Sequence, residues 1–384
     1  MGDAVQRVLG AAVMLCILAD VFLTVLYARM GTSFLASRVA RAMWKAFRLV
    51  ADPLPLRRRS GILSYCGPAI LVAMVLTWTM GLILGAALVI HPALGTGVVN
   101  PGGGGSRDFV TAIYAGCSSL SIVGSGSFIP TTAGYRLLFT ATSVCGASVL
   151  SLTLTYLMQV YSALRERNVL GLKLHLLSGE TADAAEVVAG LGAEGNFSPG
   201  YTLLAEMGAE LVQAKEAHHF YPVLFFFRFH EPYYSVSRFT LVSLDVASVI
   251  RSALHEQEYG WLMESAPVTQ IWRAGLKLAV TLEATFLPGG APEHPTPPDE
   301  EQLALWRRRY RAALRRLRQA GIRTTEDEDA GEALYLELRQ QWCPHIAMLA
   351  PEMAYGMDEI DLVMQDPEAP DDRPPFRGRR HAAG

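Results

Sequence analysis

The chain has 384 residues, of which 51% are hydrophobic and only 18% charged, and its mean hydropathy is +0.24. Soluble domains usually carry about a quarter charged residues, so this composition excludes a wholly soluble protein and indicates a membrane protein. Residues 1–164 hold 11 basic and 4 acidic residues, whereas residues 165–384 hold 22 basic and 32 acidic ones. The N-terminal part is therefore apolar and mildly basic, and the C-terminal part is acidic and water-soluble. We do not expect nucleic acid as a partner.

Three segments are long and apolar enough to cross a bilayer as helices, which takes about 20 residues. Residues 8–27 carry one charge, Asp20, and residues 61–90 and 137–164 carry none. A signal peptide is an alternative for the first segment, but a basic start and an obvious cleavage site are missing. The loop between the first two segments holds eight Lys and Arg residues, so we expect it in the cytoplasm. We therefore expect a multi-pass protein in the bilayer of the cell inner (plasma) membrane, with its N-terminus outside and the part after Leu164 cytoplasmic.

The basic loop predicts an amphipathic helix. Its basic and apolar residues recur at helical spacing on opposite sides: Arg38, Arg41, Lys45 and Arg48 on one, Val39, Met43, Phe47 and Val50 on the other. Beside a span, such a helix usually lies in the membrane interface, and packing on the soluble domain is the alternative. Asp20 lies inside the first span, where a carboxylate is costly. We interpret it as a hydrogen-bonding group that fixes helix packing, with a direct functional role as the alternative.

The segment between the second and third spans predicts a short helix followed by a glycine-punctuated strand. Asp108 is the expected N-cap, and the next twelve residues suit a helix of about 18 Å, long enough to re-enter a bilayer but too short to cross it. In the strand, Gly124 and Gly126 let the backbone adopt conformations forbidden to other residues, so that successive carbonyls can face one axis. Irregular backbone at membrane depth must be buried in protein or line water. The pattern therefore predicts a carbonyl-lined ion filter, with the negative end of the helix dipole favouring a cation.

These residues resemble the pore-loop potassium-channel superfamily, in particular bacterial channels with one pore loop per chain. The family pattern, T-x-G-Y-G with a preceding Thr and a following D-x-x-P, maps onto residues 121–130, and Gly134-Tyr135-Arg136-Leu137 is similar to the start of the family's inner helix. The resemblance implies a selectivity filter, its supporting residues, an inner-helix hinge and a monovalent cation held by backbone carbonyls of the first four filter residues. By this resemblance, the filter residues are Ile122, Val123, Gly124, Ser125 and Gly126, and the cation is bound by the carbonyls of the first four. The supporting residues are Asp108, Ser121 and Ser127, and the hinge is Gly146.

The sequence departs from the family at three filter positions. Ile122 stands in place of a Thr, Ser125 in place of a Tyr, and Ser127 in place of an Asp. We expect a cation channel with weakened preference for potassium, and no cofactor other than the permeant K⁺ or other monovalent cation. Because the chain has a single pore loop, the resemblance implies a homotetramer.

The C-terminal part of the chain predicts helices and no catalytic motif, so we do not expect an enzyme. Residues 190–195 match G-x-G-x-x-G, but a helix former precedes them instead of the strand that a dinucleotide site needs. The aromatic residues 220–229 are expected in a buried core segment. Amphipathic helices are predicted over residues 237–254 and 270–287, and further helices over 181–189, 299–320 and 326–341.

The expected fold is an all-α membrane protein with three transmembrane helices, a re-entrant pore helix and filter, and a helical cytoplasmic domain. The expected function is a tetrameric potassium-type cation channel with a cytoplasmic assembly or gating domain whose ligand is unknown. A non-conducting pore-loop receptor or scaffold, or a weakly selective channel, is the alternative. The expected parts are residues 1–60 (first span and basic helix), 61–164 (pore domain), 165–287 (cytoplasmic helical domain), 288–298 (linker), 299–365 (cytoplasmic helices) and 366–384 (disordered tail).

Overall fold

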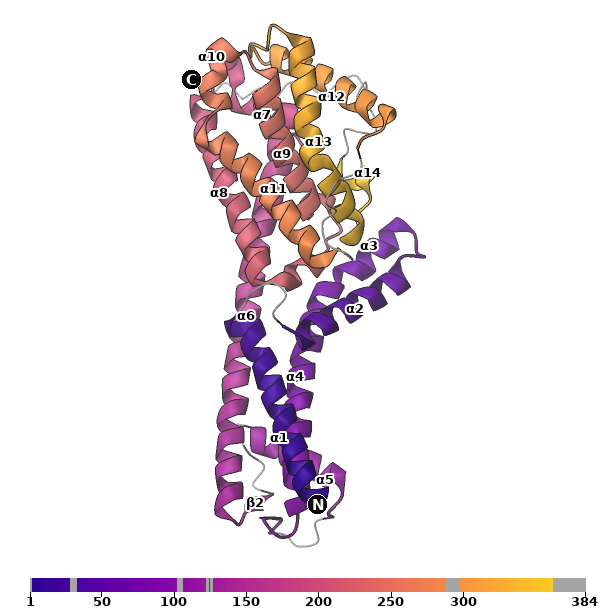
Figure 1. Ribbon diagram of the computed structural model, residues 1–384, viewed down its shortest axis with the longest axis vertical. Helices are drawn as coiled ribbons and strands as arrows, with labels where there is room; N and C mark the ends of the chain where they lie inside the picture. Colours follow the sequence, from indigo (N-terminus) through magenta and orange to yellow (C-terminus); the bar gives the residue numbers. More distant parts are fainter. Residues whose placement is uncertain are drawn as a thin grey trace, which may run out of the picture. The chain divides into compact units, whose positions relative to one another are not determined.

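The computed structural model of the protein describes residues 2–27, 33–101, 106–121, 124, 127–287 and 297–361, and it is mostly helical (Figure 1). The chain divides into two compact units. Unit 1 comprises Met1–Glu166 and Ala214–His230, and unit 2 comprises Arg167–Gln213 and Glu231–Gly384. Unit 1 thus includes a short stretch that follows the third apolar segment by about 50 residues of sequence.

Three helical stretches are long and apolar enough to cross a membrane, as the sequence predicted. The first is α1 (Gly2–Val21), continued by a π-helix (Phe22–Leu26). The second combines α3 (Leu56–Ser64), α4 (Cys66–Ile90) and a 3-10 turn (His91–Ala93).

The third stretch is α6 (Ala133–Leu177), a continuous helix of 45 residues. At 1.5 Å per residue it measures about 68 Å, more than twice the thickness of a bilayer core. The helix therefore continues well beyond Leu164, where the apolar segment ends. The basic residues Arg165 and Arg167 favour helix as much as apolar residues do, and no proline interrupts the chain before Leu177.

In unit 1, α1 packs along α4 through small residues. A Cβ atom at Gly10 of α1 would lie 2.6 Å from the carbonyl oxygen of Gly85 of α4, so the two backbones touch with no side chain between them. Gln6 lies 3.1 Å from the ring of His91, which puts the N-terminal end of α1 beside the C-terminal end of α4. Close backbone approach of this kind is how helices associate where lipid offers no hydrophobic driving force.

Asp20 is fully buried near the end of α1 and accepts four hydrogen bonds from residues that the structure describes. The backbone N–H groups of Phe34 and Leu35 donate to Oδ1 at 3.1 and 2.9 Å, and the N–H of Ala36 donates to Oδ2 at 3.2 Å. The indole N–H of Trp78 on α4 donates to Oδ2 at 2.8 Å. The packing interpretation of Asp20 is therefore confirmed: its carboxylate fixes the start of α2 (Leu35–Ala51) against α4.

The face of α2 that packs within unit 1 is centred on alanines and Trp44, beside the apolar residues noted in the sequence, of which Val39, Met43 and Phe47 are half-buried. Ala36, Ala40, Trp44 and Ala51 are buried, whereas Val50 is exposed. Trp44 packs on Phe226, with ring centroids 5.7 Å apart. This face is buried because α2 packs on α4 and on the 3-10 turn Pro222–Phe226 of unit 1, which accept the alanine side of the helix.

The predicted burial of residues 220–229 is confirmed for the centre of the stretch, where Val223 through Phe227 are each at most 5% exposed, whereas Phe220 at its start is 47% exposed. Buried Arg228 hydrogen-bonds to Ser60 of α3, so the stretch is joined to the second apolar segment.

Unit 2 is a helical bundle built around α9 (Val236–Ala253) (Figure 1). Its helices, besides the C-terminal part of α6, are α7 (Ala184–Leu191), α8 (Ser198–Phe220), α10 (Glu256–Met263), α11 (Ala266–Phe286), α12 (Glu300–Gln319), α13 (Glu328–Glu352) and α14 (Met357–Ile360). The last residues of α8 belong to unit 1. Residues 190–195 form the end of α7 and a 3-10 turn, with no strand before them, so the expected helix–turn is confirmed.

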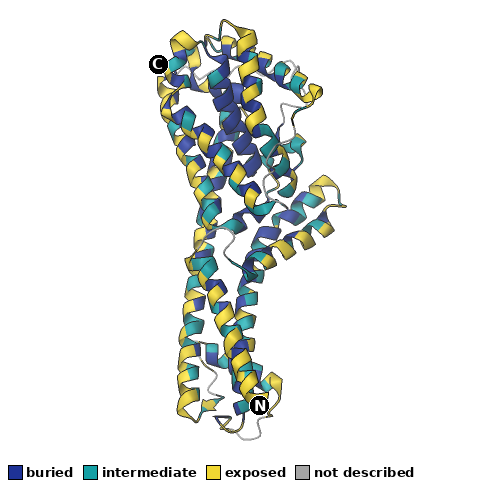
Figure 2. Cartoon of the chain, in the orientation of Figure 1, coloured by how far each residue is buried: buried dark blue, intermediate teal, exposed yellow. Residues whose placement is uncertain are grey.

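The prediction that α9 is amphipathic is wrong. Every residue of α9 except Arg251 is buried, and Figure 2 shows this helix in dark blue at the centre of the unit. Its polar residues can be buried because their hydroxyls bond back to the carbonyls one turn earlier, as Ser243 does to Phe239 at 2.7 Å and Ser252 does to Ser248 at 2.7 Å. The serines of such a helix make its sequence look amphipathic, although the helix can be buried on all sides by its neighbours.

A buried charge network joins four parts of unit 2. Arg309 of α12 and Arg339 of α13 each contact both Asp245 of α9 and Asp361 beyond α14. The Arg339 guanidinium lies 2.9 Å from Asp245 and 2.7 Å from Asp361, and Tyr335 donates to Asp245 at 2.8 Å. Arg339 also stacks against two indoles, with 5.3 Å to the ring centroid of Trp306 and 4.8 Å to that of Trp342. Two positive and two negative charges thus compensate one another away from water.

The network should make the stability of unit 2 depend on pH. Burial alone would raise the pKa of Asp361, but Arg309 and Arg339 lower it overall. A carboxyl whose pKa is lower in the folded state stabilises the fold above its unfolded pKa, and this contribution is lost as pH falls through the folded pKa.

We therefore expect Asp361→Asn to destabilise the protein at neutral pH by about 3–5 kcal/mol, because two buried guanidinium groups lose a counterion. The deficit should shrink as pH falls through the folded-state pKa of the wild-type carboxyl. Chemical unfolding of the full chain in detergent, followed by tryptophan fluorescence over acidic and neutral pH, measures this. Glu337→Gln, at an exposed position of α13, is the control. Equal unfolding midpoints for wild type and Asp361→Asn at neutral pH would contradict the role of the network.

Candidate functional site

The candidate site is built around α5 (Phe109–Leu120), the short helix that the sequence predicted between the second and third apolar segments. Asp108 caps it, because its side chain accepts the N–H of Thr111 at 3.0 Å. The hydrogen bond from Thr111 lowers the pKa of the exposed Asp108 carboxyl. Asp108 therefore stays ionised at the positive end of the helix dipole. The predicted length and cap of this helix are confirmed.

The middle of α5 packs directly on α4. Gly116 faces the α4 backbone, and a Cβ atom there would lie 2.9 Å from the nitrogen of Ala87 and 3.0 Å from the carbonyl oxygen of Ile83. Around this contact is an apolar cluster whose buried residues are Ala87, Ile90, Ala93, Leu94, Val98, Ala112 and Ala115. The glycine and the two alanines of α5 let the short helix lie directly against the backbone of α4.

The C-terminal end of α5 packs on α6. A Cβ atom at Gly146 would lie only 2.1 Å from the carbonyl oxygen of Leu120, the last residue of α5. Four residues earlier, the buried hydroxyl of Thr142 lies 3.2 Å from the carbonyl oxygen of Ser119. The carbonyl end of α5 is therefore held by α6. This contact explains why residue 146 is glycine; α6 runs through it as continuous helix, and a hinge there stays a prediction.

The chain after α5 leaves the helix at Ser121, which is exposed and extended, with φ −72° and ψ 136°. Gly124 has a φ of +63°, in the region that favours glycine. Ser127 is half-buried. The predicted filter residues Ile122, Val123, Ser125 and Gly126 lie outside the described residues, so their carbonyls stay a prediction.

The far side of the predicted filter is tied to the end of α4 by a small sheet. The strands β1 (Val98–Val99) and β2 (Ile129–Pro130) pair antiparallel. Thr131 strengthens the connection, because its N–H donates to Gly97 at 2.9 Å and its hydroxyl to Thr96 at 2.9 Å. Phe128 packs edge-on against Tyr114 of α5, with ring centroids 5.7 Å apart. Both ends of the segment 121–128 are thus anchored on the same group of helices.

On the side of α6 opposite its buried face, the structure reveals a stripe of polar residues that the sequence analysis missed. Thr140, Ser148, Ser151, Thr155 and Gln159 are all exposed in the single chain. Their spacing of three, four or eight residues puts them on one face of the helix, where exposed Val144 and Met158 also lie. Buried Thr142, Val149, Thr153, Tyr156 and Val160 lie on the other side. The helical spacing of these polar residues within the apolar segment 137–164 could have revealed the face from the sequence. We name the five exposed residues the polar stripe.

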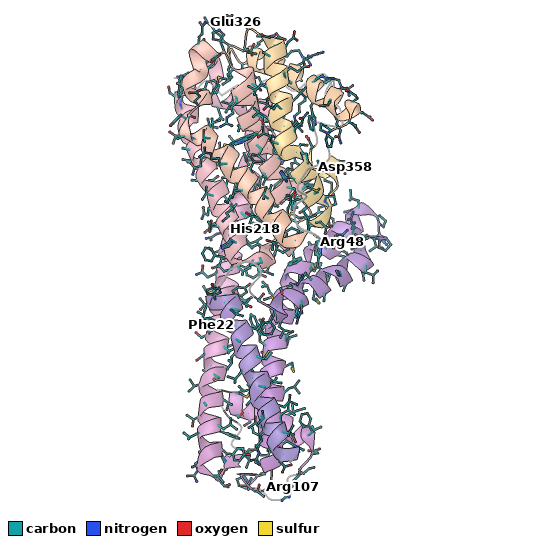
Figure 3. All side chains as sticks on the ribbon, in the orientation of Figure 1. Phe22, Arg48, Arg107, His218, Glu326 and Asp358 are labelled. Atoms are coloured by element: carbon teal, nitrogen blue, oxygen red, sulfur yellow. The ribbon has the colours of Figure 1, made fainter. Side chains whose placement is uncertain are left out.

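A metal-binding cluster or charged side chains could also form a site around the predicted filter. Among the residues that the structure describes, no cluster of His, Cys, Asp and Glu could hold a metal ion. The charged side chains that flank the predicted filter in sequence are engaged elsewhere: Asp108 caps α5, Arg107 beside it packs on Gly95, and Arg136 donates to the Pro130 carbonyl at 3.3 Å (Arg107 is labelled in Figure 3). The arrangement therefore presents backbone carbonyls and hydroxyls as its polar groups.

No protein-family model matches the chain, and no curated protein or solved structure matches it either.

The contact between α5 and α6 should be sensitive to a single methyl group. We expect Gly146→Ala to destabilise the protein by about 1–3 kcal/mol, because the added methyl overlaps the Leu120 carbonyl and forces the backbones apart. Thermal unfolding of the purified protein in detergent measures the change. Gly134→Ala, near the start of the same helix where a Cβ meets nothing, is the matched control and should be neutral or slightly stabilising. A Gly146→Ala protein as stable as Gly134→Ala would show that the contact is not tight.

Proposed function

We propose that the protein is a homotetrameric, potassium-type cation channel of the cell inner membrane, with unit 2 as its cytoplasmic assembly or gating domain. The observation that carries the proposal is the position of α5. A twelve-residue helix, too short to cross a bilayer, lies against two helices that are long enough to cross one, and its carbonyl end is held at α6. A helix C-terminus carries about half a negative charge, which favours a cation in front of it.

The polar stripe of α6 supports the same proposal. Hydroxyl and amide side chains are poor neighbours for lipid tails, and they usually face a partner or water at membrane depth. In a fourfold assembly the stripes of four α6 helices would surround one axis and line a water-filled path. The carbonyls of Ile122, Val123, Gly124 and Ser125 would form the narrow part of that path, with α5 behind them.

Ion flux tests the proposal. The full-length protein, reconstituted in planar bilayers with potassium or sodium, should give single-channel cation currents, and bi-ionic reversal potentials should show a weakened preference for potassium. Complete absence of currents under all ion and pH conditions would contradict conduction. That result would favour a non-conducting pore-loop receptor or scaffold, for which the substituted filter positions Ile122 and Ser125 are the argument.

Access to the polar stripe gives a sharper test. In a background in which the five native cysteines are replaced, we expect Thr155→Cys to react with a charged, water-soluble thiol reagent and lose most of its current. Leu154→Cys is the matched control: Leu154 is also exposed in the single chain but is turned about 100° away on the helix. Block of Leu154→Cys alone would put the wrong face of α6 on the water path.

Orientation is testable by labelling from outside the cell. We expect Ser106→Cys to react with an impermeant thiol reagent and Arg58→Cys to stay protected, because the basic segment around α3 should face the cytoplasm. Both positions are exposed, whereas Ser60 is buried against Arg228 and would be a poor reporter. The reverse labelling pattern would invert the proposed topology.

A further inference from the structure

The α2 helix has three distinct faces, of which only one is covered. Its buried face holds Ala36, Ala40, Trp44 and Ala51 and packs within unit 1. A second face presents basic side chains, and a third presents apolar side chains to solvent, including Leu49 at 81% and Val50 at 59% exposure. Lys45 and Leu49 are one turn apart, so the basic and apolar faces adjoin. A helix that only packs on its neighbours has no need of an apolar face turned outward.

The positive charge of this region is largely uncompensated. Residues 33–65, which contain α2 and α3, hold seven basic residues and one acidic residue, Asp52. Asp52 is already paired with Arg48 at 3.4 Å and with Arg59 at 3.2 Å (Arg48 is labelled in Figure 3). Five basic residues form no ion pair within the described part of the chain: Arg38, Arg41, Lys45, Arg57 and Arg58.

The position of the pair of helices is fixed by buried contacts. Asp20 holds the N-terminus of α2 beside Trp78 of α4, and α3 leads directly into α4. The basic and apolar faces are therefore presented beside the start of a helix that can cross a membrane. At the end of a membrane-spanning helix, lipid acyl chains meet the phosphates of the headgroups. The apolar face of α2 matches the acyl chains, and the adjoining unpaired basic side chains match the phosphates.

We propose that α2 and α3 together form a binding surface for anionic phospholipids. Arg41 and Lys45 of α2 and Arg57 and Arg58 of α3 contact lipid phosphates, while Leu49 and Val50 enter the acyl-chain region. The headgroup is selected by charge, and each basic side chain near an anionic leaflet contributes about 1 kcal/mol. This surface does not depend on ion conduction, and lipid binding can be measured whether or not the protein passes ions.

The test is native mass spectrometry of the full-length protein released from detergent micelles that contain phosphatidylglycerol or phosphatidylcholine. We expect several-fold more phosphatidylglycerol than phosphatidylcholine to stay bound. Arg41→Gln with Lys45→Gln, or Arg57→Gln with Arg58→Gln, should remove most of that excess. Arg308→Gln with Arg315→Gln, which deletes the same charge at exposed positions of α12, is the matched control and should leave it unchanged.

Two further measurements separate the acyl-chain contact from the binding of phosphate. Leu49→Ser with Val50→Ser should reduce the retention of both lipids, because the acyl contact is shared. Inorganic phosphate at the concentration of the lipid should not displace phosphatidylglycerol; full displacement would assign the surface to free phosphate and overturn the lipid proposal. Equal retention of both lipids by wild type, or an equal loss in the α12 control, would also overturn it.

Discussion

Unit 1 is organised by backbone-to-backbone contact at the short helix α5. Gly116 and Gly146 bring α5 against α4 on one side and α6 on the other, at separations that leave no room for even a methyl group. Because interiors are close-packed, such contacts fix distances far more tightly than long side chains do. The place where the chain leaves α5 is therefore fixed relative to both α4 and α6.

Unit 2 depends on a different constraint, the pairing of buried charge. A guanidinium removed from water is stable only when hydrogen-bonding anions surround it, so Arg309 and Arg339 require Asp245 and Asp361 at fixed positions. Asp361 lies more than a hundred residues from Asp245 in sequence, and the network therefore joins the end of the described chain to the central helix. Hydrophobic contact alone would tolerate small slides of one helix on another; four directional ion pairs do not.

Local patterns in the sequence were sufficient for α5 and for several other helices, although α8, α10 and the extension of α6 beyond Leu164 were not predicted. Asp108 as an N-cap, twelve following residues without proline, and a change to glycine and serine at 121–127 indicate where α5 starts and ends, because capping and chain-breaking are local effects. Burial of a helix face, by contrast, depends on residues that are distant in sequence. The serines of α9 suggested an exposed side although every residue of the helix except Arg251 is buried, and the sequence of α2 did not indicate that its alanines and Trp44 are the buried residues. Which face is buried is decided by neighbouring segments, such as the turn Pro222–Phe226, that lie far away in sequence.

The site itself was only partly predictable. The sequence indicated Gly146 for its flexibility, whereas its described role is contact with the Leu120 carbonyl, which requires knowledge of two separate helices. The polar stripe could have been found from spacing alone, but hydroxyls within an apolar segment are inconspicuous, since they lower its hydropathy only slightly. Asp20 was interpreted correctly because a lone carboxylate in an apolar helix must find donors.

The donors that Asp20 needs also have a consequence for biogenesis. A carboxylate in an apolar helix costs up to a few kcal/mol during insertion into a membrane. Its four hydrogen bonds come from Phe34, Leu35, Ala36 and Trp78, all of which are synthesised after it. The first helix is therefore synthesised before the partners of this carboxylate, and in a membrane the group would meet its described donors only once α2 and α4 have been made. This dependence favours insertion of the two apolar helices α1 and α4 as a pair, after translation of the roughly sixty residues that separate Asp20 from Trp78.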